Sequence, residues 1–114
     1  MTPPKRRRLS DRRLASVVYV ARSTIHGRGL FAARSIAADE YIGTFHGPRV
    51  SDDGCHVLWV YPDKGAPVGR VGCNLLRFLN HATPYSAAFE GFDLYACRAI
   101  QAGEEITIDY AEAE

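Results

Sequence analysis

Short runs of β-branched and aromatic residues, separated by glycine, proline and asparagine, recur along this chain and leave little room for a long helix. Val17–Val20, Tyr41–Phe45, His56–Tyr61 and Phe92–Cys97 have the composition of strands. Ile106 and Ile108 alternate near the end and predict a last strand. This rhythm is typical of a mainly β domain, a β-rich α+β fold, rather than of alternating strand–helix units.

One segment predicts a helix. Apolar residues between Gly72 and Asn80 fall at helical spacing, and such a helix would span about two turns. No internal repeat is evident. We expect one domain over residues 16–114, after a basic and disordered tail over residues 1–15.

Charge is distributed unevenly. Residues 1–13 hold six basic side chains against Asp11 alone, for a net charge of +5, whereas the rest holds eight basic and twelve acidic side chains, for −4. The tail can bind nucleic acid, although a solvated segment is the favoured interpretation. The acidic body favours a cationic partner. We expect a cytoplasmic protein with no membrane segment, since no apolar run approaches the length of a membrane helix.

Cys55, Cys73 and Cys97 are widely spaced and form no CxxC pair. We therefore predict no metal site, and we expect these thiols to be free and buried.

The segment Gly27–Ala32 satisfies the glycine pattern of dinucleotide-binding proteins, G-x-G-x-x-G/A. That fold needs a helix that opens at the second glycine, but Gly43 and Gly47-Pro48 follow too soon. We reject a dinucleotide site and keep two alternatives. The glycines either form a tight turn or let backbone N–H groups approach an anionic ligand.

Four segments, in this order, resemble the SET domain, the fold of many S-adenosylmethionine-dependent protein lysine methyltransferases. They are HGRGLFA (His26–Ala32), ADEYIGTFHG (Ala38–Gly47), RFLNH (Arg77–His81) and AGEEITIDY (Ala102–Tyr110). The last two are the most specific. The resemblance implies short strands in several small sheets, a C-terminal pseudoknot, and an enzyme that methylates lysine in a protein substrate.

The resemblance also implies the cofactor and the site residues. S-adenosyl-L-methionine would be the cofactor. Tyr110 would be the catalytic residue, and it would line the substrate channel with Phe45 and Phe89. The residues that would bind the cofactor are His26, Gly27, Arg28, Gly29, Phe31, Arg77, Phe78, Asn80 and His81.

The sequence departs from the family pattern. Ala82 replaces a serine or cysteine, Phe45 and Phe89 stand where the family often has tyrosine, and the family's asparagine is replaced around Tyr85-Ser86. These losses favour an alternative: a catalytically inactive SET-like module that binds cofactor or a basic peptide.

The printed sequence ends soon after Tyr110, so we expect a minimal domain without the cysteine-rich zinc module that often follows. Either a second subunit, in a homodimer, or a bound substrate would then supply the missing channel wall. The expected substrate is a lysine-containing, basic protein or peptide. Any association with the nucleoid or the nucleus would come through that substrate.

Overall fold

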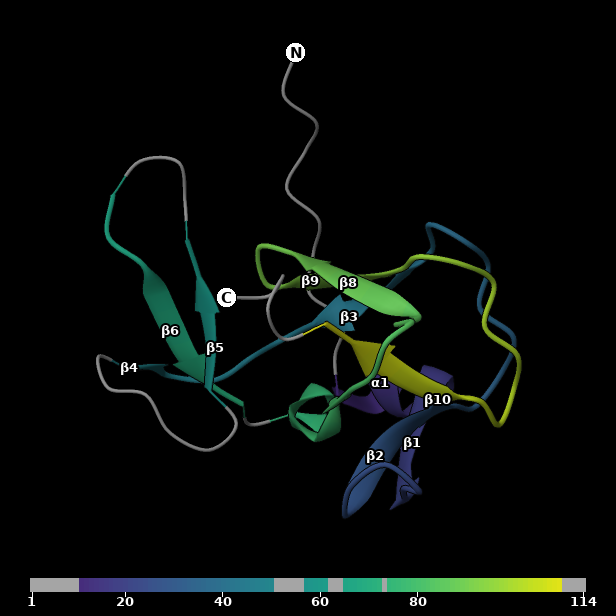
Figure 1. The fold of residues 1–114 in the computed structure, drawn as a ribbon. Coiled ribbons are helices and arrows are strands. Elements are labelled where there is room, and N and C mark those ends of the chain that lie inside the picture. The colour runs from purple at the N-terminus through teal and green to yellow at the C-terminus, as the bar shows by residue number, and fades with distance from the viewer. Residues whose placement is uncertain (1–10, 51–56, 62–64, 73, 110–114) are drawn as a thin grey trace.

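The structure is a computed structural model that describes residues 11–50, 57–61, 65–72 and 74–109. Its described residues form one short α-helix, a 3₁₀ helix and ten short strands in three small sheets, which confirms the mainly β class and the expected short strands in several small sheets (Figure 1). The helical elements and strands, in chain order, are α1 (Asp11–Val17), β1 (Val18–Arg22), β2 (Arg28–Ala32), β3 (Tyr41–Thr44), β4 (Arg49–Val50), β5 (Val57–Val60), β6 (Val68–Val71), η1 (Leu75–Phe78), β7 (Asn80–His81), β8 (Ala87–Glu90), β9 (Asp93–Ala96) and β10 (Glu105–Ile108).

The first sheet joins elements that are far apart in the sequence. Its order is β1-β2-β10-β7, with β1 and β2 as an antiparallel hairpin. Strand β10 runs antiparallel to β2 and parallel to β7, where Thr107 pairs with Asn80 and Ile108 with His81. Because β10 is central, Ile106, Thr107 and Ile108 are all buried, so both of its faces are covered.

The expected helix over Gly72–Asn80 is wrong in kind. The segment forms only the four-residue 3₁₀ helix η1, which follows Asn74 and ends where Leu79 takes an extended conformation (φ −60°, ψ 130°). The apolar spacing that suggested a helix instead places Leu76 and Leu79 in the core. The chain must then enter β7, and strand pairing overrides weak helical propensity.

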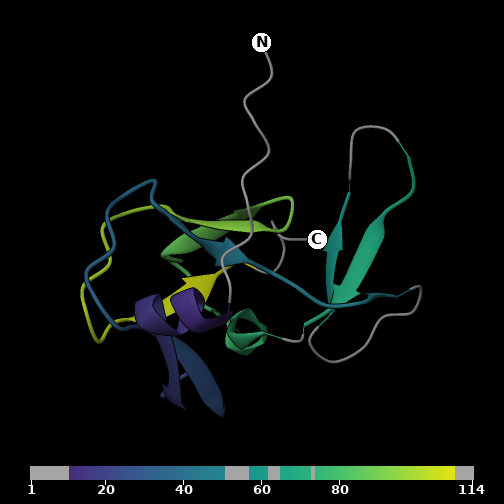
Figure 2. The ribbon, with the colours of Figure 1, turned by 180° about the vertical axis from the view of Figure 1, so that it is seen from behind.

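The expected disordered tail over residues 1–15 is wrong for residues 11–15, which belong to α1. Leu14 and Val17, three positions apart, lie on one face of the helix and are buried, whereas Arg12 and Arg13 are exposed. The helix packs against β1, β3 and η1 (Figure 2). Residues 1–10 lie outside the described part of the chain. Among the described helices, none is long and apolar enough to cross a membrane.

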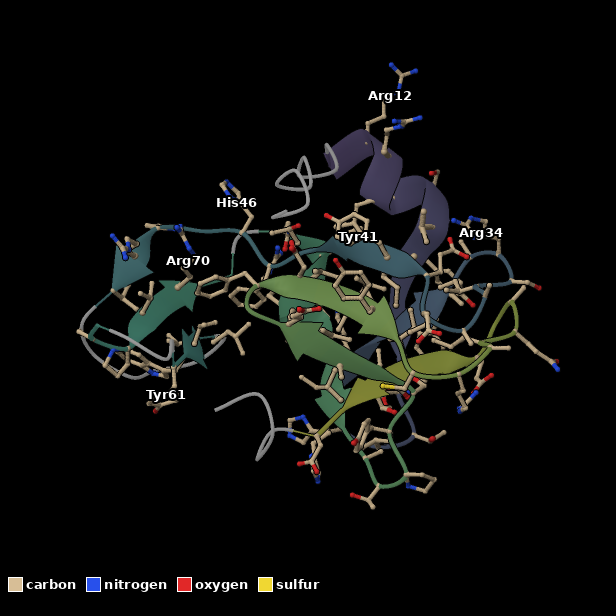
Figure 3. All side chains as sticks on the ribbon, turned by 90° about the horizontal axis from the view of Figure 1, so that it is seen from above. Arg12, Arg34, Tyr41, His46, Tyr61 and Arg70 are labelled. Atoms are coloured by element: carbon tan, nitrogen blue, oxygen red, sulfur yellow. The ribbon has the colours of Figure 1, made fainter. Side chains whose placement is uncertain are left out.

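The sheet of β4, β6 and β5 stands to one side of the other two sheets (Figure 1). Arg70 joins it to the body: its guanidinium donates to the carbonyl of Gly47 at 2.9 Å and lies 5.2 Å from the centroid of the Phe92 ring. Trp59 lies so close to Gly69 on the paired strand that a Cβ there would meet the indole at 2.9 Å. Arg70 thus sets the orientation of this sheet, at the opposite side of the molecule from Arg34 (Figure 3).

Two corners of the chain have the same structure, although no repeat was expected. They are RSIAADE (Arg34–Glu40) and RAIQAGE (Arg98–Glu104). In each, the arginine pairs with the closing glutamate, and that glutamate also accepts a hydrogen bond from a backbone N–H three residues earlier. Asp39 and Gly103 occupy matching positions and both have positive φ, 66° and 85°.

The two corners also bind each other as pseudo-twofold partners. Ile36 and Ile100 exchange both backbone hydrogen bonds at 2.8 Å. Ala32 and Ala96 bond to the corners in the same way. The N–H of Ala32 donates to the carbonyl of Glu104, and its carbonyl accepts from the N–H of Gly103. Ala96 bonds to Glu40 and Asp39 in the same pattern. This reciprocal contact ties the β2–β10 sheet to the β3–β9 sheet.

Replacement of Leu14 tests whether α1 belongs to the core. Leu14 is 1% exposed, and its Cδ1 lies 2.9 Å from the position that a Cβ on Gly43 would take. We expect Leu14→Ala to lower the free energy of unfolding by about 2–4 kcal/mol, since it leaves a cavity between α1 and β3. Urea denaturation measures this, with exposed Arg12→Ala as the control. Equal stability of the two variants would show that α1 does not contribute to the core.

The corners predict a weak loss of stability in acid. Hydrogen bonds from Arg34 and from the Ala37 backbone lower the pKa of Glu40 below its ordinary value, and Arg98 does the same to the pKa of Glu104. A lowered folded-state pKa means that this stabilisation is present above the unfolded-state pKa and is lost as the pH falls through the folded-state value. The pairs are exposed, so each contributes only about 0.2–1 kcal/mol.

We expect the free energy of unfolding to decrease less between pH 5 and pH 3 in Glu40→Gln than in the wild type, because the variant has no carboxylate at this position to protonate. Urea midpoints at several pH values measure it. A larger decrease in the free energy of unfolding in the variant than in the wild type would contradict a stabilising role of the Glu40 carboxylate.

Candidate functional site

The turn between β1 and β2 is the exposed edge of the site. It carries the predicted glycine segment and closes on itself where the Ser23 N–H donates to the carbonyl of Gly27 at 2.8 Å. Gly27 has φ +42°, a conformation that favours glycine. The second glycine, Gly29, lies within strand β2 and opens no helix, in agreement with the rejection of a dinucleotide fold. The side chains from Thr24 to Arg28 are exposed, so neighbouring elements must fix the shape of this turn.

Asn80 supports the turn from below. The pairing of β7 with β10 places its side-chain nitrogen 3.0 Å from the carbonyl of His26, 3.1 Å from the carbonyl of Arg28 and 3.0 Å from Glu105 Oε2. Three oxygens around one atom identify it as the amide nitrogen. An NH₂ group has two hydrogens, so the three acceptors share them and no donor capacity remains.

Two residues at this site were not among those predicted. Glu105 accepts from the hydroxyl of Ser23 at 2.8 and 3.0 Å, and that hydroxyl accepts from the backbone N–H of Ile25 at 2.9 Å. The sequence places Glu105 in the AGEEITIDY segment but gives it no role of its own. Glu104 and Glu105 make different contacts although they are neighbours. Glu105 begins β10 and its side chain reaches β2, whereas the side chain of Glu104 belongs to the second corner.

The other predicted cofactor residues lie around this centre at different depths. His81 is exposed, with Nδ1 3.8 Å from Asp109 Oδ1. The guanidinium of Arg77 lies 4.5 Å from the centroid of the Phe78 ring and donates to the carbonyl of Asn74. Phe31 lies on β2 and stacks on Tyr19 at 5.6 Å. The structure therefore joins His26, Arg28 and Asn80 directly, and holds Phe31 in the same sheet.

The predicted channel residues lie on other elements. Phe45 is 6% exposed and meets Phe89 edge to face, with ring centroids 6.1 Å apart. Tyr110, the predicted catalytic residue, lies outside the described residues, as do Cys55 and Cys73. The pseudoknot and the channel therefore stay predictions. Cys97 is exposed, so the expectation of a buried thiol is wrong at that position, which follows the last residue of β9.

The departure at Ala82 is accompanied by other contacts. Its backbone N–H donates to the carbonyl of Ile108 at 3.2 Å. Ser86 is fully buried, and its hydroxyl accepts from the backbone N–H of Thr107 at 3.0 Å, while its own N–H donates toward Thr107. A serine four positions further along thus holds the segment against β10.

A hollow of about 550 Å³ opens beside the turn, lined by Val20, Ala21, Arg22, Gly27 and Arg28. Arg22 and Arg28 pair across the hairpin. Like charges directly opposite each other are unfavourable, and no described acidic residue forms an ion pair with either. The hollow is therefore electropositive.

Comparison with known proteins agrees with this arrangement. The family model for the SET domain matches residues 27–111. The chain belongs to the SET-domain family. It is 29% identical to the histone-lysine N-methyltransferase MEDEA of Arabidopsis thaliana, with 82% of this chain and 16% of that protein covered. It is 30% identical to the histone-lysine N-methyltransferase mes-2 of Caenorhabditis elegans, with 82% of this chain and 15% of that protein covered. The chain thus spans a small part of each relative's length.

Asn80 should matter for stability even without a ligand. Asn80→Ala removes the amide donor that two carbonyls and a carboxylate share, so we expect the free energy of unfolding to fall by about 1–3 kcal/mol. Urea denaturation measures the change. The neighbouring variant His81→Ala, at an exposed side chain, should stay within about 0.5 kcal/mol of the wild type. An Asn80→Ala protein as stable as His81→Ala would contradict the bonding described above.

Proposed function

We propose that this SET domain transfers a methyl group from S-adenosylmethionine to a lysine side chain of a protein. The observation that carries the proposal is the meeting of the glycine turn, Asn80 and Glu105 within hydrogen-bond distance, in a chain that belongs to the SET family. The names of the two relatives support lysine as the acceptor.

The residues present fit the amino-acid end of this cofactor, which carries a carboxylate and an ammonium group. The electropositive hollow beside Gly27, lined by Arg22 and Arg28, suits the carboxylate. The carbonyls gathered under the turn and the side-chain oxygen of Asn80 suit the ammonium group, because each is an acceptor. His81 would meet the adenine through its main chain.

S-adenosylmethionine, when bound, supplies an electrophilic methyl group on a positively charged sulfur. The protein must present a neutral amine, but a free lysine has a pKa of about 10.4. Apolar surroundings disfavour the ammonium form and lower this pKa. Phe45 and Phe89 offer an apolar wall of this kind.

Tyr110 would orient the amine through its hydroxyl. Its unperturbed pKa of about 10 makes it a poor general base at neutral pH. Most of the rate enhancement would come from positioning and from the electrostatics of the site.

A second hollow, of about 380 Å³, supports a basic substrate. It lies over β8 and β9, and its lining includes the acidic side chains of Asp39 and Glu90 and the ring of Tyr95. Carboxylates and an aromatic face together favour cationic side chains.

Tyr110→Phe tests the enzymatic role. We expect the variant to bind S-adenosylhomocysteine as the wild type does but to lose about 10- to 100-fold in methyl transfer to a basic protein mixture, because the amine is no longer oriented. Calorimetry measures binding, and transfer of a labelled methyl group measures turnover. Tyr61→Phe, at a 58% exposed tyrosine, is the control.

The possible results separate the alternatives. A wild type that binds cofactor and transfers nothing to any protein would favour the inactive module. Full activity in Tyr110→Phe would remove that tyrosine from the mechanism.

A further inference from the structure

Glu105 occupies the space beneath the glycine turn. A Cβ on Gly29 would lie 2.3 Å from Glu105 Oε2, so any larger residue at position 29 would displace the carboxylate. Gly29 is itself buried in β2. The second glycine of the motif therefore leaves room for a carboxylate of the protein, whatever ligand binds on the outer side.

Ser23 transmits the position of this carboxylate to the turn. A hydroxyl has one hydrogen and two acceptor sites. The hydrogen of Ser23 goes to Glu105, and the oxygen accepts from the backbone N–H of Ile25 at 2.9 Å and of His26 at 3.4 Å. Every hydrogen-bonding site of this hydroxyl is in use, and all of them fix the turn relative to β10.

Asn80 completes the connection from the other side. Its amide nitrogen donates both to Glu105 and to the carbonyls of His26 and Arg28, so the carboxylate also fixes the rotamer of Asn80. With the nitrogen held inward, the side-chain oxygen is the group of Asn80 that remains for an outside donor. Together with the two carbonyls, the carboxylate thus determines which atom of Asn80 a ligand meets.

We propose that Glu105 is a positioning residue which, through Ser23 and Asn80, holds the glycine turn in its ligand-binding shape. It would not touch the cofactor. The proposal rests on the proposed function, since it takes S-adenosylmethionine as the ligand of the turn. The physical reason is preorganisation. The turn from Thr24 to Arg28 is exposed, so without this support the turn would lose conformational entropy when the ligand binds, and the affinity would fall.

The adjacent glutamate provides a matched control. Glu104 has the same side chain one position earlier, but it pairs with Arg98 in the second corner. Glu105→Gln keeps the shape and replaces one acceptor oxygen with an NH₂ group, which would face either the amide of Asn80 or the hydroxyl of Ser23. Ser23→Ala removes the link to the turn, with Ser35→Ala, at an exposed serine outside the site, as its control.

The experiment compares four variants with the wild-type chain: Glu105→Gln with its control Glu104→Gln, and Ser23→Ala with its control. Calorimetry gives the affinity for S-adenosylhomocysteine, steady-state methyl transfer gives separate KM values for the cofactor and for the protein substrate, and hydrogen exchange reports the amides of Ile25 and His26. We expect Glu105→Gln and Ser23→Ala to bind about 10- to 100-fold more weakly, because a charge-assisted hydrogen bond is lost. The KM for the cofactor should rise, the KM for the protein substrate should not, and the two amides should exchange faster.

Glu104→Gln and Ser35→Ala should match the wild type in all three measurements. Wild-type affinity in Glu105→Gln would overturn the proposal. So would a fall in melting temperature with unchanged affinity and unchanged KM values, since that is the pattern of a purely structural residue. A wild type that does not bind S-adenosylhomocysteine at all would instead refute the proposed function. In that case the exchange of the Ile25 and His26 amides alone would decide whether Glu105 holds the turn.

Discussion

The parallel pairing of β7 with β10 is the contact on which the site depends. It involves only Asn80 and His81 on one side, paired with Thr107 and Ile108 on the other. A two-residue strand contributes little stability alone, so its position must be enforced by neighbours, here by the N–H of Ala82 and by the reciprocal bonds of Ser86. Once it is in place, Asn80 lies under the glycine turn, and residues from three distant segments share one hydrogen-bonded cluster.

The twin corners explain how so small a domain keeps its sheets in register. Each corner is a closed ring of an arginine, a glutamate and a backbone N–H, and the pair is joined through Ile36 and Ile100, both 1% exposed. The second corner leads directly into Glu105 and β10. The backbone bonds of Ile100, Gly103 and Glu104, which do not depend on the Glu104 side chain, therefore fix where β10 begins, and hence where the Glu105 carboxylate lies relative to β2.

The sequence allowed β1, β3, β5, β9 and β10 to be predicted, because the composition of these segments carries that information locally, but β4, β6, β7 and β8 are not evident in it. It did not show α1, since the two core residues Leu14 and Val17 are surrounded by arginine, serine and alanine. It did not show the corner repeat, because only the arginine, isoleucine, alanine and glutamate positions are shared and the rest of the similarity is in backbone bonding. Ser23 was missed because a single serine carries no signal until its partner is known to be Glu105.

The site residues also show why motif and role need not coincide. Both glycines of the turn match a ligand-binding pattern, yet they are required for different physical reasons. Gly27 is needed for its backbone conformation, and a Cβ there would meet nothing within 4 Å, whereas Gly29 has ordinary strand geometry and a Cβ there would meet the Glu105 carboxylate at 2.3 Å. In the same way, the two neighbouring glutamates belong to separate structures, one to a surface corner and one to the turn support. Some residues of a motif are thus needed for the protein's own packing and others for its ligand, and only the contacts of each residue distinguish these two roles.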